Sequence, residues 1–231
     1  MTDKAEKGIT LIELLVAIAI VGILAVLVAP ELGRFRSNYN ARSCATDLIQ
    51  YMRVARAMAI KENREYLIVF DTTANNQRYL IGFDGDGDND LITPDSDTFG
   101  ICNDTDNPPD RLPNGDALVN GVPSCVRVVN LTDCGNNIIY GYTAGTTPPN
   151  GPNGLAIPAS GVNFGGTPPT AEFDSDGSTD KLGSVYFQQT IRGYSYCVRI
   201  SNTSGLMNIW KWDGDNENAI NQGKTTWTEI R

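Results

Sequence analysis

The apolar run from residue 9 to residue 28 constrains this chain most, because it is long, almost uncharged and close to the N-terminus. A helix of about 20 apolar residues rises roughly 30 Å, which matches the hydrocarbon thickness of a bilayer. Glu13 is the only charged residue in the run. A carboxylate at that depth costs roughly 2.5–3.5 kcal/mol, so such residues usually have a partner. The run therefore predicts a membrane-spanning helix whose single acid is paired.

The residues before the run, Met1 to Gly8, are few and mostly polar. A secretory signal carries its small-residue cleavage site after the apolar run. Here the small residue, Gly8, stands directly before the run. The order favours a retained helix over a removed signal, and an ordinary signal anchor with a chance glutamate is the alternative.

Residues 8–16 read Gly-Ile-Thr-Leu-Ile-Glu-Leu-Leu-Val, which resembles the processing site of type IV pilins and type II secretion pseudopilins. The resemblance implies that a prepilin peptidase cuts between Gly8 and Ile9 and that Ile9 is then N-methylated. Glu13 matches the glutamate that this family uses in assembly, and Pro30 matches its helix-kinking proline. Ile9 departs from the commoner phenylalanine or methionine.

The same resemblance implies a cellular location and a set of binding partners. It implies a single-pass inner-membrane protein with an extracytoplasmic domain, which then enters a pilus or pseudopilus filament. Its partners would be the lipid bilayer before assembly, the inner-membrane assembly platform and other pilin or pseudopilin subunits. In the filament, Glu13 would meet the α-amino group of Ile9 in an adjacent subunit, which offsets the cost of burying its charge.

We expect an α+β fold in which a long N-terminal helix packs on an antiparallel β-sheet. The predicted segments are a leader at 1–8, a membrane or filament-core helix at 9–30, the second half of the helix at 31–63, and a β domain at 64–231. A loop-rich insertion falls at about 84–160. Apolar residues spaced by three and four mark the packed face of the second half of the helix: Ala41, Ala45, Leu48, Met52, Ala55 and Ala59.

Short runs of strand-forming residues follow the helix. They lie at 65–70, 78–83, 126–131, 137–142, 161–164, 171–173, 183–187, 194–200 and 206–210. The first two predict a hairpin, and the last five predict a meander. The Ala-Arg-Ala-Met-Ala-Ile stretch at 55–60 and the Phe-Asp-Ser-Asp-Gly turn at 173–177 resemble the GspH/FimT group of minor pseudopilins and pilins.

Five cysteines in an exported chain predict oxidised pairs with one thiol left over. Cys125 and Cys134 are nine residues apart, and their pairing would close a small local loop that contributes roughly 2.5 kcal/mol. Cys102 and Cys197 are other partners, so the connectivity stays open. Cys44 is either the odd thiol or a staple between the helix and the domain.

The acidic stretch after residue 83 predicts a calcium site. Asp84, Asp86 and Asp88 alternate with small residues, Asp90 can supply a carbonyl or carboxylate oxygen, and Asp95 holds the twelfth place of an EF-hand-like loop. Calcium takes six to eight oxygen ligands at about 2.4 Å. The loop lacks the usual turn glycine and bidentate glutamate, and a solvated acidic loop is the alternative. No cofactor is otherwise required.

Composition argues against other functions. A formal charge of −9 disfavours nucleic-acid binding, which needs basic surface. The chain has no histidine, and no nucleophile–base pair or phosphate loop is evident, so we expect no enzyme. The sequence thus favours a structural subunit, a minor pilin or pseudopilin. The alternatives are a major pilin, or a minor pilin that acts as an adhesin or a DNA-uptake module.

Overall fold

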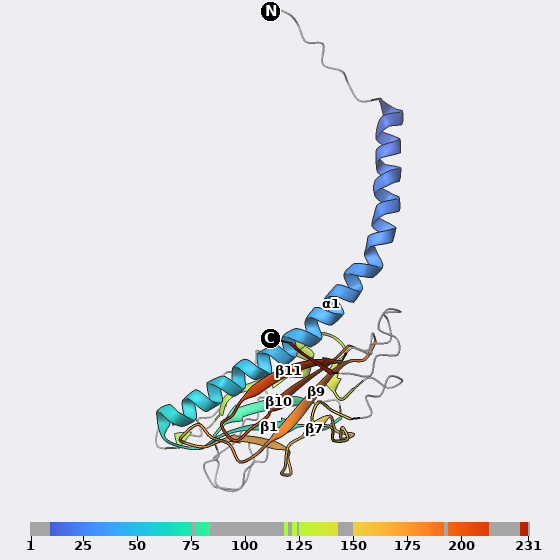
Figure 1. The fold of residues 1–231 in the computed structure, drawn as a ribbon. Coiled ribbons are helices and arrows are strands. Elements are labelled where there is room, and N and C mark those ends of the chain that lie inside the picture. Colours follow the sequence, from blue (N-terminus) through green and yellow to red (C-terminus); the bar gives the residue numbers. More distant parts are fainter. Residues whose placement is uncertain are drawn as a thin grey trace, which may run out of the picture. The chain divides into compact units, whose positions relative to one another are not determined.

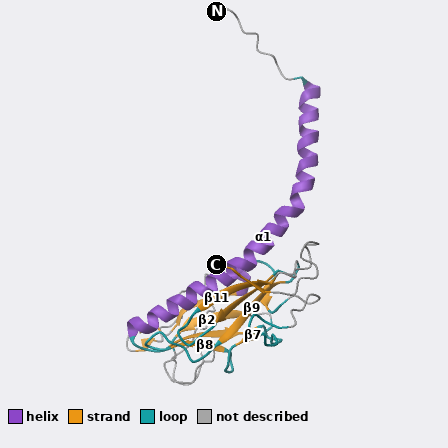
Figure 2. Cartoon of the chain, in the orientation of Figure 1, coloured by secondary structure: helices purple, strands orange, loops and turns teal. Residues whose placement is uncertain are grey.

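The computed structural model shows one long helix followed by β-structure (Figure 1). It describes residues 10–74, 77–83, 118–119, 122–123, 125–142, 150–191, 194–212 and 227–230. Figure 2 shows the strands beside the C-terminal part of the helix. All strand pairs among the described residues are antiparallel. The α+β class predicted from the sequence is therefore confirmed.

Helix α1 spans Leu11–Glu62 and is not interrupted at Pro30. The chain forms two compact units, residues 1–37 and residues 38–231, and their boundary lies within α1. The first unit holds the apolar part of α1, and the second holds the rest of α1 and the whole β-structure. The boundaries predicted at residues 30 and 63 stay predictions.

The predicted packing face of the second half of α1 is confirmed. Its six predicted residues are all fully buried, and Cys44 and Ile49 join them. Small alanines on this face let the helix backbone lie close to the strands beneath it. The charged residues Arg42, Arg53 and Lys61 lie off the face and are exposed.

The first sheet has the strand order β5-β2-β1-β8. Its strands are β1 (Tyr66–Asp71), β2 (Arg78–Gly82), β5 (Cys125–Asn130) and β8 (Thr170–Phe173). β1 is buried along its whole length, which explains why its sequence is continuously apolar from Tyr66 to Phe70 rather than alternating. A short 3-10 helix, η1 (Leu131–Cys134), follows β5.

The second sheet has the order β12-β11-β10-β9-β6, and β7 also pairs with β9. Its strands are β6 (Ile138–Tyr140), β7 (Val162–Asn163), β9 (Gly183–Gln189), β10 (Ser195–Ile200), β11 (Met207–Trp212) and β12 (Trp227–Ile230). A separate two-stranded pair joins β3 (Leu118–Val119) and β4 (Val122–Pro123).

The meander predicted at the C-terminus is only partly right. Strands β9, β10, β11 and β12 do follow one another, but β8 leaves them and pairs with β1, with Tyr66 opposite Phe173 and Ile68 opposite Ala171. The physical reason is burial, since Ala171 and Phe173 join the apolar core in this position. One apolar core unites α1 and residues of both sheets.

Candidate functional site

The apolar half of α1 is the most exposed hydrophobic surface of the described chain. Its large side chains are between 48% and 81% exposed, and they are Leu11, Ile12, Leu14, Leu15, Val16, Ile18, Ile20, Val21, Ile23, Leu24 and Val26. A contiguous apolar surface of this kind marks a site that binds lipid or another protein. The helix therefore needs a partner that the single chain does not supply.

Among the described residues, no helix is long and apolar enough to cross a membrane. The membrane-spanning segment at residues 9–28 stays a prediction.

Glu13 lies at the beginning of this helix and caps it. The Glu13 backbone N–H donates to Thr10 Oγ1 at 3.3 Å, and the Thr10 N–H and hydroxyl both donate to Glu13 Oε2 at 3.5 Å. This reciprocal arrangement of Thr10 and Glu13 is a capping box, which satisfies N–H groups left unpaired in the first turn. Sequence reasoning missed Thr10, although the Thr-x-x-Glu spacing before an apolar run is its signal.

The capping role means that Glu13 is held near the helix N-terminus before any partner arrives. Its carboxylate remains exposed, and the positive end of the helix dipole stabilises it there. The predicted cleavage residues Gly8 and Ile9 lie outside the described residues. The side chain of Pro30 also lies outside them, so its kinking role stays a prediction.

The predicted disulfide between Cys125 and Cys134 is wrong. Cys134 in η1 pairs instead with Cys44 on α1, 90 residues away, with the two Cα atoms 5.3 Å apart. The reason is the fold, because η1 follows β5 directly beneath the buried face of α1 that carries Cys44. Of the two roles open for Cys44, the staple is confirmed. Cys197 is a buried free thiol.

The predicted calcium ligands Asp84, Asp86, Asp88, Asp90 and Asp95 lie outside the described residues, so that site stays a prediction.

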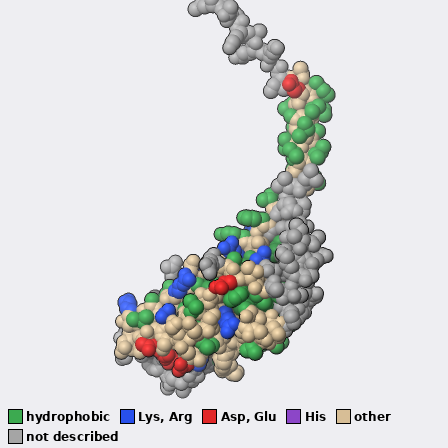
Figure 3. Space-filling model, in the orientation of Figure 1, with side chains coloured by type: hydrophobic (Ala, Val, Ile, Leu, Met, Phe, Trp, Pro, Cys, Tyr) green, Lys and Arg blue, Asp and Glu red, His purple; other side chains and the backbone are tan. Residues whose placement is uncertain are grey.

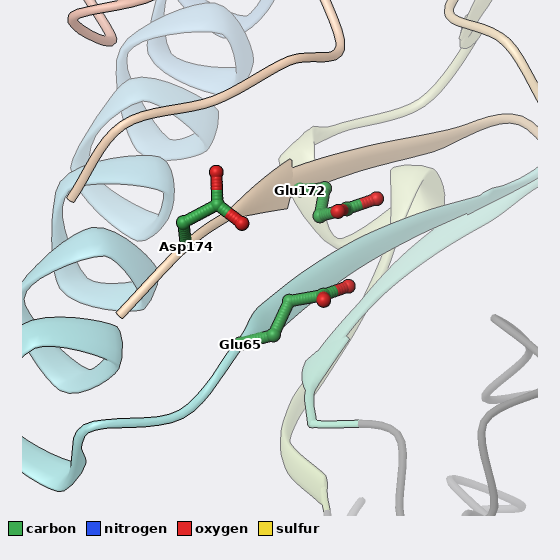
Figure 4. A group of neighbouring side chains, drawn as sticks. All are labelled: Glu65, Glu172 and Asp174. Atoms are coloured by element: carbon green, nitrogen blue, oxygen red, sulfur yellow. The ribbon is translucent and has the colours of Figure 1, made fainter. Parts of the chain in front are cut away.

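The structure brings together another acidic group. Glu65 precedes β1, while Glu172 and Asp174 lie in and just after β8, and their carboxylates lie within 4.8 Å of one another (Figure 4). We call these three residues the acidic cluster. Lys181 Nζ forms an ion pair with Glu172. Asp174 also accepts a hydrogen bond from the Ser178 hydroxyl at 3.2 Å.

Burial and neighbouring negative charge change the pKa of one carboxyl group in the acidic cluster. Partial burial of its carboxyl group, with the neighbouring Glu172 carboxylate, raises the pKa of Glu65 to about 7. Lys181 opposes this change. Among the described residues, Lys181 is the cation that interacts with the carboxylates of the cluster, so their negative charge is only partly offset.

The raised pKa predicts that stability depends on pH. Folded Glu65 holds its proton more tightly than unfolded Glu65, whose pKa is near 4.5. The associated stability is fully present below about pH 4.5 and is lost as pH rises through about 7. We expect Glu65→Gln to unfold at higher urea concentration than wild type at about pH 8. The gain should stay below about 1 kcal/mol, because the exposed residue is screened by solvent.

The control for this prediction is Glu229→Gln on β12, which removes a charge far from the acidic cluster in the sequence. Urea unfolding of the full chain is measured between about pH 4 and pH 8. The free energy of unfolding should change with pH in this variant as it does in wild type. The prediction would be contradicted if the free energy of unfolding changed with pH equally in wild type and in Glu65→Gln.

Comparison with known proteins adds evidence at the N-terminus. A family model described as "Prokaryotic N-terminal methylation motif" matches residues 3–29. Two curated relatives from Pseudomonas aeruginosa, each described as "Fimbrial protein", are 35% identical to this chain over 102 residues. The alignment covers 40% of this chain, and the chain spans 62% of the length of each relative. No solved structure matches the chain significantly.

Proposed function

We propose that this chain is a member of the type IV pilin family and a structural subunit of an extracytoplasmic filament, which its N-terminal motif and its similarity to fimbrial proteins support. One observation carries the proposal: the apolar half of α1 is exposed, and it continues into a half that a disulfide links to the β domain. The first half can enter a lipid or protein environment while the domain folds outside it.

The proposed mechanism is assembly rather than chemistry. The N-terminal half of α1 anchors the precursor in the inner membrane, a peptidase removes residues 1–8, and the new N-terminus at Ile9 is methylated. The apolar helix then leaves the bilayer and packs among the helices of neighbouring subunits, which bury its exposed side chains. Glu13 exchanges its capping bonds with Thr10 for the α-amino group of Ile9 in a neighbour.

We also propose that the subunit is a minor pilin or pseudopilin of the GspH/FimT type. The motifs at 55–60 and 173–177 support this, because the first lies at the end of α1 and the second forms the turn after β8. A major pilin is the alternative.

Cleavage is the direct test of this proposal. We expect the mature protein, isolated from membranes or filaments, to begin at Ile9 and to carry one added methyl group. The Gly8→Val variant should keep residues 1–8, because a branched side chain at the cleavage position blocks the peptidase. Intact-mass measurement distinguishes the two forms, and Glu6→Ala is the control that should be cut normally. A mature wild-type chain that begins at Met1, or beyond Val28, would overturn the family assignment.

A further inference from the structure

The exposed apolar surface of α1 does not end with the apolar run. Leu32 and Phe35 are 63% and 71% exposed, and a spacing of three residues places them on the same side of the helix. Both belong to the compact unit of residues 1–37, which also holds the exposed apolar half of α1. Figure 3 shows hydrophobic side chains along the first part of this helix. Leu32 and Phe35 therefore extend the surface that needs a partner.

Two arginines accompany these apolar side chains. Arg34 and Arg36 stand on either side of Phe35 in the sequence, and the Arg36 side chain is exposed. Residues 32–46 contain three arginines and no acid. The local charge is thus positive, on a chain whose formal charge is −9. We call residues 32–36 the interfacial segment.

The interfacial segment lies at the depth of the lipid headgroups when the apolar run spans the bilayer as proposed above. Helix α1 is not interrupted at Pro30, the last residue of the predicted membrane helix. A rise of 1.5 Å per residue then puts residues 32–36 about 3–9 Å beyond Pro30. The headgroup layer on each side of the hydrocarbon is about 5–8 Å thick. Long arginine side chains can reach phosphates from the outer edge of this layer, while apolar side chains face the acyl chains.

Anionic phospholipid is the partner that matches this composition. Arginine keeps its charge in proteins and binds phosphate through two parallel hydrogen bonds. Aromatic and aliphatic side chains beside basic ones are typical of helices that lie at a membrane surface. Each basic residue near an anionic bilayer strengthens binding by about fivefold. The two arginines of the segment therefore favour anionic headgroups over zwitterionic ones.

We propose that the interfacial segment binds anionic phospholipid headgroups in the leaflet on the side of the β domain, before the subunit enters a filament. This inference rests on the proposed function, because it needs the apolar half of α1 to be in the membrane. The contact sets how deeply the helix is inserted. Deeper insertion would bury the two arginines in hydrocarbon, and shallower insertion would expose the two apolar side chains to water. Leaving the bilayer then requires that the phosphate contacts break.

Lipid selectivity of the full chain in detergent tests the proposal. Native mass spectrometry, with phosphatidylglycerol or phosphatidylcholine added in steps, gives an apparent dissociation constant for each lipid. We expect wild type to bind phosphatidylglycerol at least about tenfold more tightly than phosphatidylcholine, since each arginine contributes about fivefold. The Arg34→Gln/Arg36→Gln variant should lose most of that preference, and Arg34→Lys/Arg36→Lys should keep most of it because the charges remain.

The matched control is Arg42→Gln/Arg53→Gln. It removes two exposed arginines of the same helix, but both belong to the unit that holds the β domain. This variant should keep the wild-type preference for phosphatidylglycerol. Equal losses in the two glutamine variants, or a wild-type chain that binds both lipids equally, would overturn the proposal.

Cross-linking distinguishes lipid from a protein partner. A photoreactive amino acid in place of Phe35 should cross-link to phospholipid in cells that lack the assembly platform, where no filament forms. A cross-link to protein alone would overturn lipid as the partner of this surface.

Carbonate washing separates a failure of this inference from a failure of the proposed function. A wild-type chain that alkaline carbonate removes from phosphatidylglycerol vesicles would refute membrane anchoring, and with it both the proposed function and the lipid contact. A chain that stays inserted but shows no preference for phosphatidylglycerol would overturn the lipid contact alone.

Discussion

Replacement of Cys134 by serine is expected to lower the free energy of unfolding by about 4 kcal/mol. The disulfide to Cys44 spans 90 residues, and cross-linking a loop of that length removes much of the conformational entropy of the unfolded chain. Part of the effect is local, since the bond fixes η1 against the buried face of α1. Urea unfolding of the full chain in mild detergent, under oxidising conditions, measures the change.

Reduction provides the internal control for this expectation. A reductant should lower the stability of wild type to that of Cys134→Ser and should leave the variant almost unchanged. Peptide mapping without reduction should recover a peptide of Cys44 joined to one of Cys134. A Cys134 peptide joined to Cys125 or Cys102 would contradict the observed pairing.

The disulfide also shows what the sequence could not supply. Local spacing favoured Cys125 and Cys134 because a short loop closes at little entropic cost. The true partner, Cys44, lies on the predicted helix face between Ala41 and Ala45. Its burial follows from the helical period, but its approach to η1 depends on how β5 is placed under the helix, and no periodicity encodes that placement.

Regular elements were predictable where one physical preference dominates. The helix face at 41–59 was predicted correctly because its apolar spacing has the helical period. The hairpin of β1 and β2 was predicted from two apolar runs on either side of a polar turn. The two strands are antiparallel as predicted, with Leu67 opposite Gly82. Each of these features depends on neighbours that are close in the sequence.

Contacts between distant segments were less predictable. Strand β8 was assigned to the C-terminal meander, yet it pairs with β1 more than a hundred residues before it. Strand β12 (Trp227–Ile230) was missed because the exposed residues Thr228 and Glu229 interrupt its apolar pattern. The acidic cluster was missed because Glu65 and Glu172 come together only through the pairing of β1 with β8.

Phe70 connects the two sheets through the contacts of its aromatic ring. It lies on β1 of the first sheet and is fully buried. Its ring stacks on that of Phe164 with centroids 5.5 Å apart, and it meets the Tyr140 ring of β6 edge-on at 6.3 Å. Tyr140 in turn donates its hydroxyl to the Arg78 carbonyl at 2.8 Å. These contacts connect the first sheet to the second.

We expect Phe70→Ala to lower the free energy of unfolding by about 3–5 kcal/mol, because it leaves a cavity where a buried ring was and removes both aromatic contacts. Phe70→Leu should lose less, since leucine refills part of the volume. Ile191→Ala is the control, because that side chain is 68% exposed and its loss should change stability by less than about 0.5 kcal/mol. Urea unfolding followed by tryptophan fluorescence measures all three. Near-equal midpoints for Phe70→Ala and Ile191→Ala would mean that the two sheets are held together by contacts other than those of Phe70.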